Sequence, residues 1–318
     1  MQNMKKVVIV IGIIFIFVLV GLLGWFLGIE MRVSETNSPI NLIKPRPLDK
    51  YSLDNLANSQ INPGKIEILR SLDENDKFSS FLFTFSYNPG LVEKETKKTS
   101  GLTNIPQASG PFPLILMLRG YVDQKRYITG DGTRNAAEVF ANSGYITVAP
   151  DFLGYADSDP EASNTFESRF QTYVTVISLI NSLDEPSFAK AITDKWDGKN
   201  ILIWGHSNGG QIALIILEIT GESYPTTLWA PVSKPFPYSI LYYTDESEDR
   251  GKLIRRELAK FEEDYNPDLY SLDLYLDRIK APLLIHQGGN DNAVPVEWSN
   301  ELVDKLLDLN LSLDYYKY

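Results

Sequence analysis

The stretch ILIWGHSNGGQIALIIL, residues 201–217, joins two apolar segments through a short turn that contains one serine. Its first four residues are predicted to form a buried strand, and 211–220 a helix that is apolar on nearly all sides and hence deeply buried. Ser207 lies between them, with Gly205 and Gly209 two residues away on either side. A strand, a sharp G-x-S-x-G turn and a buried helix are typical of a nucleophile elbow.

This turn predicts that Ser207 is a nucleophile. The elbow strains the serine backbone so that the hydroxyl projects above the sheet, and side chains two residues away on either side would collide, which explains both glycines. The N-terminus of the following helix lies beneath the site and favours developing negative charge. The alternative is a tight strand–helix turn in which the serine is a bystander.

A mostly parallel α/β sheet with helices on both faces is predicted, because strand and helix segments alternate along the chain. Residues 65–70 and 78–87 are expected to be antiparallel neighbours at one edge of this sheet. Ligands on such sheets bind at the carboxyl ends of the strands. Further strands are expected at 113–118, 145–150, 201–204, 226–231, 282–286 and 311–318, and helices at 135–144, 166–183, 211–220 and 296–309.

Three segments depart from this alternation. Residues 233–280 lie between two core strands and are expected to be a cap insertion that covers the carboxyl edge of the sheet over a pocket. Residues 30–60 carry several prolines and little periodicity, which predicts an extended linker leading into a catalytic domain at 61–318. The lysines at 94–98 are expected to lie in a solvated loop.

The N-terminus predicts a membrane anchor. Residues 7–29 carry no charge, and about 20 apolar residues suffice to span a bilayer as a helix. Two lysines within residues 1–6 should keep that end cytoplasmic, so the domain that follows is expected to be extracytoplasmic, on a single-pass cell-membrane protein. The alternative is a cleaved signal peptide, although the apolar stretch is longer than usual and lacks a small-residue cleavage site.

Composition excludes several classes of function. Apolar residues make up 43% and charged residues 22% of the 318, as in a globular protein with a sizeable core. The formal net charge of −11 disfavours a nucleic-acid partner. The absence of cysteine excludes disulfides and thiolate chemistry, and His206 and His286, the two histidines, form no zinc-site spacing. No cofactor or metal is expected, and the oligomeric state is not predicted.

At this point the chain resembles the α/β-hydrolase superfamily and, within it, the catalytic domain of the prolyl oligopeptidase family. The resemblance covers roughly residues 65–318. GHSNGG at 205–210 is similar to that family's elbow. PDFLGYADSD at 150–159 is similar to its Pro-Asp-x-x-Gly-x-Gly-x-Ser loop, with Ala156 in place of the second glycine. HQGGNDNAVP at 286–295 is similar to its His-Gly-x-x-Asp-x-x-Val-Pro segment, with a one-residue shift.

The resemblance implies site residues. Asp291 is expected to orient the catalytic histidine, whereas Asp151 is expected to be structural and to bond backbone in its loop. An oxyanion hole needs two donors, and the Asn208 amide, just after the nucleophile, is the first. The second is assigned to Tyr121, by its amide, in a loop where Arg119 stands in place of the family's frequent histidine. The alternative is that Tyr121 merely lines the pocket.

No residue of the sequence is assigned as the general base of this site. The fold places serine, acid and histidine in that order, yet no histidine follows Asp291. His206 is adjacent to the nucleophile and should point away from it, and His286 matches a structural position of the family. The catalytic histidine is therefore expected to be absent from these 318 residues because the C-terminal end is truncated. The rival is an inactive pseudo-enzyme.

The predicted function is a membrane-anchored serine hydrolase, a prolyl oligopeptidase-like peptidase that acts on short peptides through an acyl-enzyme at Ser207. The first alternative is a carboxylesterase on the same fold, which differs in its leaving group. The second is a non-catalytic envelope protein that uses the fold to bind a ligand. Expected partners are a small peptide or ester and, through residues 7–29, the lipid bilayer.

Overall fold

A computed structural model describes residues 16–26, 44–92, 95–183, 195–244 and 247–318, together with 185, 188, 190 and 192. The chain divides into two units, Met1–Arg46 and Pro47–Tyr318. In the first unit, residues 16–26 are helical and expose their side chains. The rest of the predicted anchor at 7–29 lies outside the described residues. Across the residues that are described, no helix has the length and hydropathy to cross a membrane.

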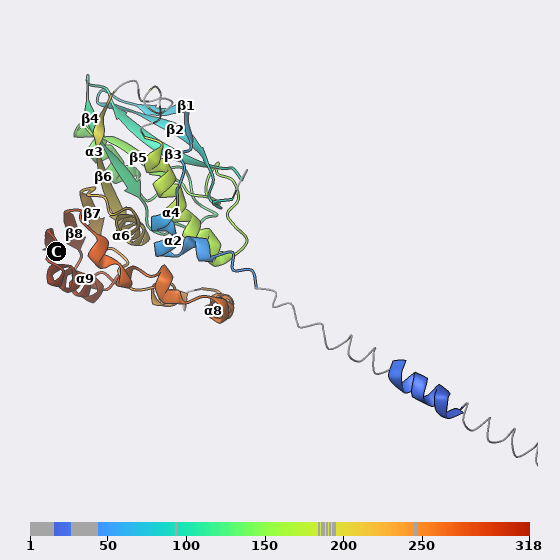
Figure 1. Ribbon diagram of the computed structural model, residues 1–318. Helices are drawn as coiled ribbons and strands as arrows, with labels where there is room; N and C mark the ends of the chain where they lie inside the picture. Colours follow the sequence, from blue (N-terminus) through green and yellow to red (C-terminus); the bar gives the residue numbers. More distant parts are fainter. Residues whose placement is uncertain are drawn as a thin grey trace, which may run out of the picture. The chain divides into compact units, whose positions relative to one another are not determined.

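The second unit is built on a nine-stranded sheet with the strand order β1-β2-β3-β5-β4-β6-β7-β8-β9 (Figure 1). The strands are β1 (Lys65–Glu74), β2 (Phe78–Tyr87), β3 (Lys97–Pro106), β4 (Phe112–Leu118), β5 (Ile146–Pro150), β6 (Trp196–His206), β7 (Thr226–Trp229), β8 (Leu283–Gln287) and β9 (Leu313–Lys317). From β5 through β9 neighbouring strands are parallel, whereas β1, β2, β3 and β5 pair antiparallel. The predicted mostly parallel sheet with an antiparallel edge is confirmed.

Helices cover both faces of this sheet. They are α2 (Leu53–Asn58), α3 (Arg134–Asn142), α4 (Thr165–Asn181), α6 (Asn208–Thr220), α7 (Tyr238–Leu241), α8 (Lys252–Asp264) and α9 (Val296–Asp308), with short 3₁₀ turns η1 (Asp49–Tyr51), η3 (Pro267–Tyr270), η4 (Leu272–Leu274) and η5 (Leu276–Arg278). Successive side chains of a strand point to opposite faces. Accordingly, Leu114 and Leu116 of β4 pack in the core with α4 and α6, whereas Ile115 and Met117 pack with Ala137 of α3.

Strand β3 was not predicted, because its sequence is polar. Its first residues are lysines that the sequence assigned to a solvated loop, but from Thr99 onward the strand is buried. Some of its buried polar groups have partners on neighbouring elements: Ser80 donates to Asn104 at 2.8 Å, and Ser100 donates to Asp151 at 2.6 Å. A strand whose burial depends on hydrogen bonds therefore lacks the apolar pattern by which strands are recognised.

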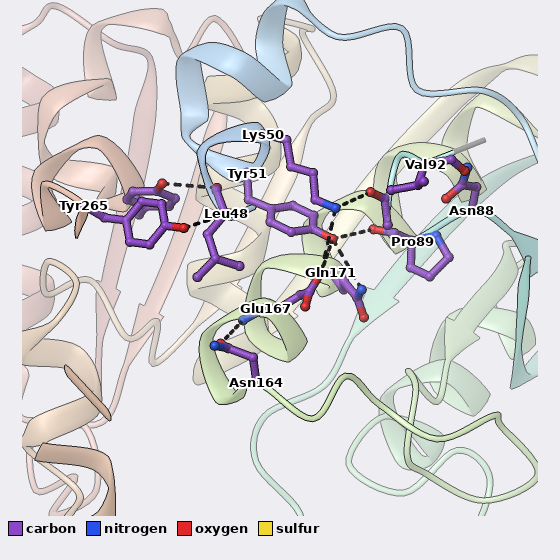
Figure 2. A network of polar contacts seen from close by, with 12 residues as sticks. Leu48, Lys50, Tyr51, Asn88, Pro89, Val92, Asn164, Glu167, Gln171 and Tyr265 are labelled. Carbon is purple, nitrogen blue, oxygen red and sulfur yellow. Dashed lines mark hydrogen bonds and ion pairs between the residues drawn. The ribbon is translucent and has the colours of Figure 1, made fainter. Parts of the chain in front are cut away.

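The domain begins earlier than predicted, at Pro47, because residues 47–60 fold against it instead of forming a linker. Figure 2 shows the contacts that hold this segment. The Tyr51 side chain is fully buried, and its hydroxyl lies 3.1 Å from the Pro89 carbonyl oxygen and 3.2 Å from a Glu167 carboxylate oxygen. The Leu48 amide donates to the Tyr265 hydroxyl at 3.2 Å. Burial raises the pKa of Tyr51, which keeps this phenol neutral.

Most of the insertion at 233–280 packs elsewhere than predicted, although the Tyr243 hydroxyl donates to the Ala293 carbonyl at 3.0 Å, in the loop that follows β8. Its aromatic side chains, including Phe236, Phe261 and Tyr270, stack against Phe166 and Phe170 of α4, and η4 and η5 contact α6 (Figure 1). No described residue of the insertion lines the cavity beside the elbow. The prediction of a cap over that pocket was wrong, because these large apolar side chains are buried against the helix layer.

Helix α6 carries a buried acid near its C-terminal end. Glu218 is almost fully buried, and neither carboxylate oxygen has a hydrogen-bond partner among the described residues. Burial raises the pKa of Glu218 well above its ordinary value, and the nearby charges of Asp273 and Asp277 raise it further, against a smaller opposing effect of Arg278. The environment of Glu218 therefore favours its protonated, uncharged form.

Replacing Tyr51 should show that residues 47–60 belong to the folded domain. Y51A removes a fully buried aromatic side chain, so we expect it to lower the free energy of unfolding by about 3–5 kcal/mol. Leu69→Ala, at a position where the side chain is 53% exposed, is the control and should change it by less than about 0.5 kcal/mol. Urea unfolding followed by tryptophan fluorescence measures both. Equal stability of the two variants would contradict the assigned boundary.

The buried Glu218 should make stability fall as pH rises. Between the unfolded-state pKa near 4.3 and the raised folded-state pKa, the folded protein holds a proton that the unfolded chain has released, so stability decreases by about 1.4 kcal/mol per pH unit. We expect E218Q to remove this decline and to exceed the original chain in stability at pH 7.5 but not at pH 4. Urea unfolding at both pH values tests this, with exposed Glu222→Gln as the control that keeps the decline.

Candidate active site

The backbone of Ser207 adopts the strained geometry expected of an elbow. Its φ of 53° and ψ of −117° lie where residues other than glycine are rare. Hydrogen bonds hold this conformation: the Ser207 amide donates to the Trp229 carbonyl at 2.9 Å, and the amides of Gly210 and Val232 each donate to the Ser207 carbonyl at 3.0 Å. The serine is thereby fixed between the end of β6, the start of α6 and the end of β7.

Glycines allow three backbone segments to meet at the elbow. A Cβ on Gly205 would lie 2.6 Å from the Gly209 carbonyl oxygen, and a Cβ on Gly209 would overlap the Leu118 carbonyl at the end of β4. Both elbow glycines are therefore required by close approach of backbone, as the sequence pattern predicted. Gly120, which the sequence analysis did not single out, is also confined, because a Cβ there would lie 3.1 Å from the Ser207 Cβ.

The loop after β4 lies against the nucleophile, as an oxyanion loop must. Gly120 contacts the elbow, the next residue is Tyr121, and Tyr121 and Asn208 together line one cavity. The Tyr121 side chain is 81% exposed, so its position in the loop rather than its packing determines its role. The loop position is compatible with amide donors from Asn208 and Tyr121, and those two assignments stay predictions.

Arg119 holds this loop in place. Its buried guanidinium donates to the carbonyl oxygens of Gly120 and Asp151, at 3.0 Å each, and lies 3.9 Å from the Tyr155 ring centroid. Asp151 is fully buried, and its carboxylate accepts from Ser100 at 2.6 Å, from Tyr127 and Thr129, and from one amide, that of Gly130. Asp151 thus has the structural role that was expected, with hydroxyls as its main partners.

Asp291 lies in the loop that follows β8. One of its carboxylate oxygens accepts hydrogen bonds from the amides of Ala293 and Val294, at 2.9 Å each, which fixes the side chain in a tight turn. Burial lowers the pKa of His206, and the charge of Asp291 opposes that shift. Because β6, β7 and β8 are parallel neighbours, the elbow after β6 and the Asp291 loop after β8 lie at the same edge of the sheet.

The two histidines occupy other positions. The His286 ring stacks on Trp229, with 4.8 Å between ring centroids, and its Nδ1 lies 2.9 Å from the Tyr318 hydroxyl. Burial lowers the pKa of His286. Within the part of the chain that the structure describes, neither His206 nor His286 hydrogen-bonds to Ser207. The structure therefore does not place either histidine as the base, and the roles of Ser207 and Asp291 stay predictions.

A cavity of about 340 Å³ opens beside the elbow. Its lining includes Asn208, Tyr121 and Arg119, and also Arg169 of α4, which the sequence analysis did not single out. The sequence signal for Arg169 is weak: it is one cation on a helix whose buried side is mostly, but not wholly, apolar. No group of three or more His, Asp or Glu side chains within the described residues is arranged to hold a metal ion.

Comparisons with known proteins agree with this geometry. The family described as "Prolyl oligopeptidase family" matches residues 132–316, more than half of the chain. The "Uncharacterized peptidase YtmA" of Bacillus subtilis (strain 168) is 24% identical over 225 residues, which cover 70% of this chain and 79% of that protein. The matched range contains Ser207 and Asp291 but begins after the loop that carries Tyr121.

Solved structures show the same fold. Acetyl xylan esterase from Paenibacillus sp. R4 superposes with a TM-score of 0.60 at 16% identity, covering 86% of this chain and 90% of that one. Pyrococcus horikoshii acylaminoacyl peptidase superposes with a TM-score of 0.50 at 14% identity, covering 81% of this chain and 45% of that one. At these identities the similarity establishes the α/β-hydrolase fold and does not identify a substrate.

A side chain at an elbow glycine should be incompatible with the turn. G209A places a methyl group against the backbone of Leu118, which cannot yield as a flexible side chain could, so we expect a loss of about 3 kcal/mol or more in unfolding free energy. Gly288→Ala is the matched control, because its Cβ would have only an ordinary 3.8 Å contact with Asp291. Denaturant unfolding compares the two, and a G209A protein as stable as G288A would refute the described elbow.

Proposed function

Because the chain belongs to the prolyl oligopeptidase family and is a serine hydrolase, we propose that it cleaves short peptides through an acyl-enzyme at Ser207. The observation that carries this proposal is the positive φ of Ser207 in a turn confined by glycines. Strain of this kind costs of order 1–3 kcal/mol and persists where the surroundings enforce it, typically at functional sites. A bystander serine would not need it.

The proposed reaction follows the order of groups around the elbow. The Ser207 hydroxyl oxygen attacks the substrate carbonyl carbon while a base accepts its proton. The amides of Asn208 and Tyr121 stabilise the negative charge that develops on the carbonyl oxygen. The protonated base then gives its proton to the leaving amine, and the acyl-enzyme remains on Ser207. Water releases the acyl group by the same steps, while Asp291 keeps the base oriented.

The base is proposed to be an imidazole that Asp291 orients, in the order of serine, acid and base that the fold requires. His286 is held in an aromatic stack, and His206 directly precedes the nucleophile on a strained turn, so neither is proposed for this role.

A carboxylesterase is the second candidate, since the same groups at the elbow would serve an ester. Acetyl xylan esterase, a protein named for ester cleavage, shares the fold over 86% of this chain, and this supports the scaffold's suitability but no substrate. The two candidates differ in the leaving group alone: a peptidase releases an amine, which needs protonation, and an esterase releases an alcohol. A peptide anilide and a short ester, assayed together, distinguish them by their ratio of kcat/KM.

A fluorophosphonate probe should label Ser207 of the purified full chain. We expect imidazole in solution to raise the labelling rate by about 10²-fold, because general-base assistance contributes at least that much. S207A should abolish labelling, and Ser143→Ala, at an exposed helix end, should leave it unchanged. Mass spectrometry of the labelled peptides measures both effects. If Ser207 stays unlabelled with and without imidazole, the non-catalytic binding protein becomes the better explanation.

A further inference from the structure

Arg169 places a positive charge in the cavity beside the elbow. It lies on α4, lines the cavity together with Asn208, and is partly exposed there. Its guanidinium donates to the side-chain oxygen of Gln211, and a second, long contact of 3.5 Å joins it to the side-chain oxygen of Asn208. The cation therefore contacts the residue that directly follows the nucleophile, and it lines the space that a substrate would enter.

The partners of Arg169 are neutral. Gln211 and Asn208 are amides, and the third partner, Tyr173, stays an un-ionised phenol because burial raises its pKa. The Nε of Arg169 is buried without a hydrogen-bond partner. Among the residues that the structure describes, no carboxylate forms an ion pair with Arg169. A guanidinium that is partly removed from water and lacks a counter-charge binds an anion more strongly than a fully solvated one does.

The other charged groups of the cavity do not fill this role. Arg119 also lines it, but its guanidinium is bound to the loop carbonyls and lies near the buried carboxylate of Asp151. Glu161 lines the cavity as well, and its carboxylate accepts a hydrogen bond from Ser168 at the exposed rim. The wall that faces the elbow is therefore positive at Arg169, and the negative charge of Glu161 lies at the rim.

We propose that this cavity is a subsite for an anionic group and that Arg169 pairs there with a carboxylate of the substrate. The inference rests on the proposed function, which it deepens by naming a substrate class: peptides or esters that carry a carboxylate close to the scissile bond. A carboxylate matches the planar guanidinium better than a neutral amide does, and each charge-assisted hydrogen bond is stronger than a neutral one. Arg169 is thus a specificity-determining residue.

Binding of glutarate to the full chain tests the subsite without requiring turnover. Glutarate carries carboxylates, and glutaramide is its neutral counterpart of similar shape. We expect isothermal titration calorimetry to give glutarate at least about tenfold higher affinity than glutaramide, as charge-assisted bonding predicts. R169Q should remove that preference, and R169K should keep part of it. Equal affinity for the two compounds, or unchanged glutarate binding by R169Q, would overturn the proposal.

Controls separate the subsite from general charge effects and from misfolding. Arg70→Gln removes an exposed arginine on β1, away from the cavity, and should bind glutarate as the unaltered chain does. Thermal unfolding establishes that each variant is folded. Should R169Q fail to fold, R169K decides instead: a reduced but remaining preference for glutarate supports the proposal, and a preference equal to that of the unaltered chain overturns it.

Hydrolysis of a charged and a neutral ester tests whether the subsite affects the reaction at Ser207. 4-Nitrophenyl succinate and 4-nitrophenyl butyrate differ by a carboxylate on the acyl group, and we expect R169Q to lower the ratio of their kcat/KM values at least about tenfold. Loss of activity on both esters alike would contradict the proposal. If glutarate binds through Arg169 but Ser207 is never labelled by fluorophosphonate, the subsite stands and the proposed function fails, so the two failures are distinguishable.

Discussion

The positive φ of Ser207 is the constraint on which the site depends. The conformation is held by backbone bonds from three sides and is possible only because Gly205, Gly209 and Gly120 let neighbouring backbones approach. As a result, the ends of β4, β6 and β7 and the start of α6 converge on Ser207. A nucleophile fixed by strands and a buried helix is positioned more accurately than one on a free loop.

Much of the fold could be predicted from apolar periodicity, and its failures have physical causes. The parallel strands and the helices α3, α4, α6 and α9 were predicted within a few residues, since each is an apolar run bounded by turn residues. Strand β3 was missed because hydrogen bonds to Ser80 and Asp151, rather than apolar contacts, stabilise its buried side chains. Residues 47–60 were missed because their buried apolar side chains are few and irregularly spaced: Leu48, Tyr51, Leu53 and Leu56.

Candidate site residues could be predicted where they belong to one short sequence motif. They could not be predicted where they come together only through folding of segments that are far apart in sequence. Ser207 and its glycines form a contiguous sequence pattern, and Asp291 belongs to a second contiguous pattern that directly follows a predicted strand. Gly120 matters through its distance to Ser207, and Arg169 through the cavity that it lines. Neither is visible without coordinates, because both depend on segments that are far apart in sequence. The insertion at 233–280 was mispredicted for the same reason. Its position between two core strands suggested a cap, whereas its aromatic residues pack against α4.

Helix α6 links the start of the domain to the serine. It begins at Asn208, directly after the nucleophile, and along its length it contacts α2, η4 and η5. A helix of three to four turns moves as a stiff rod, so a shift at one end is delivered to the other. Displacements of about 1 Å at a reacting atom can cost 10²-fold in rate. Helix α2 near the start of the domain therefore supports the helix that positions Ser207. Weakening the contact between α2 and α6 would disturb the position of Ser207 before it unfolded the sheet.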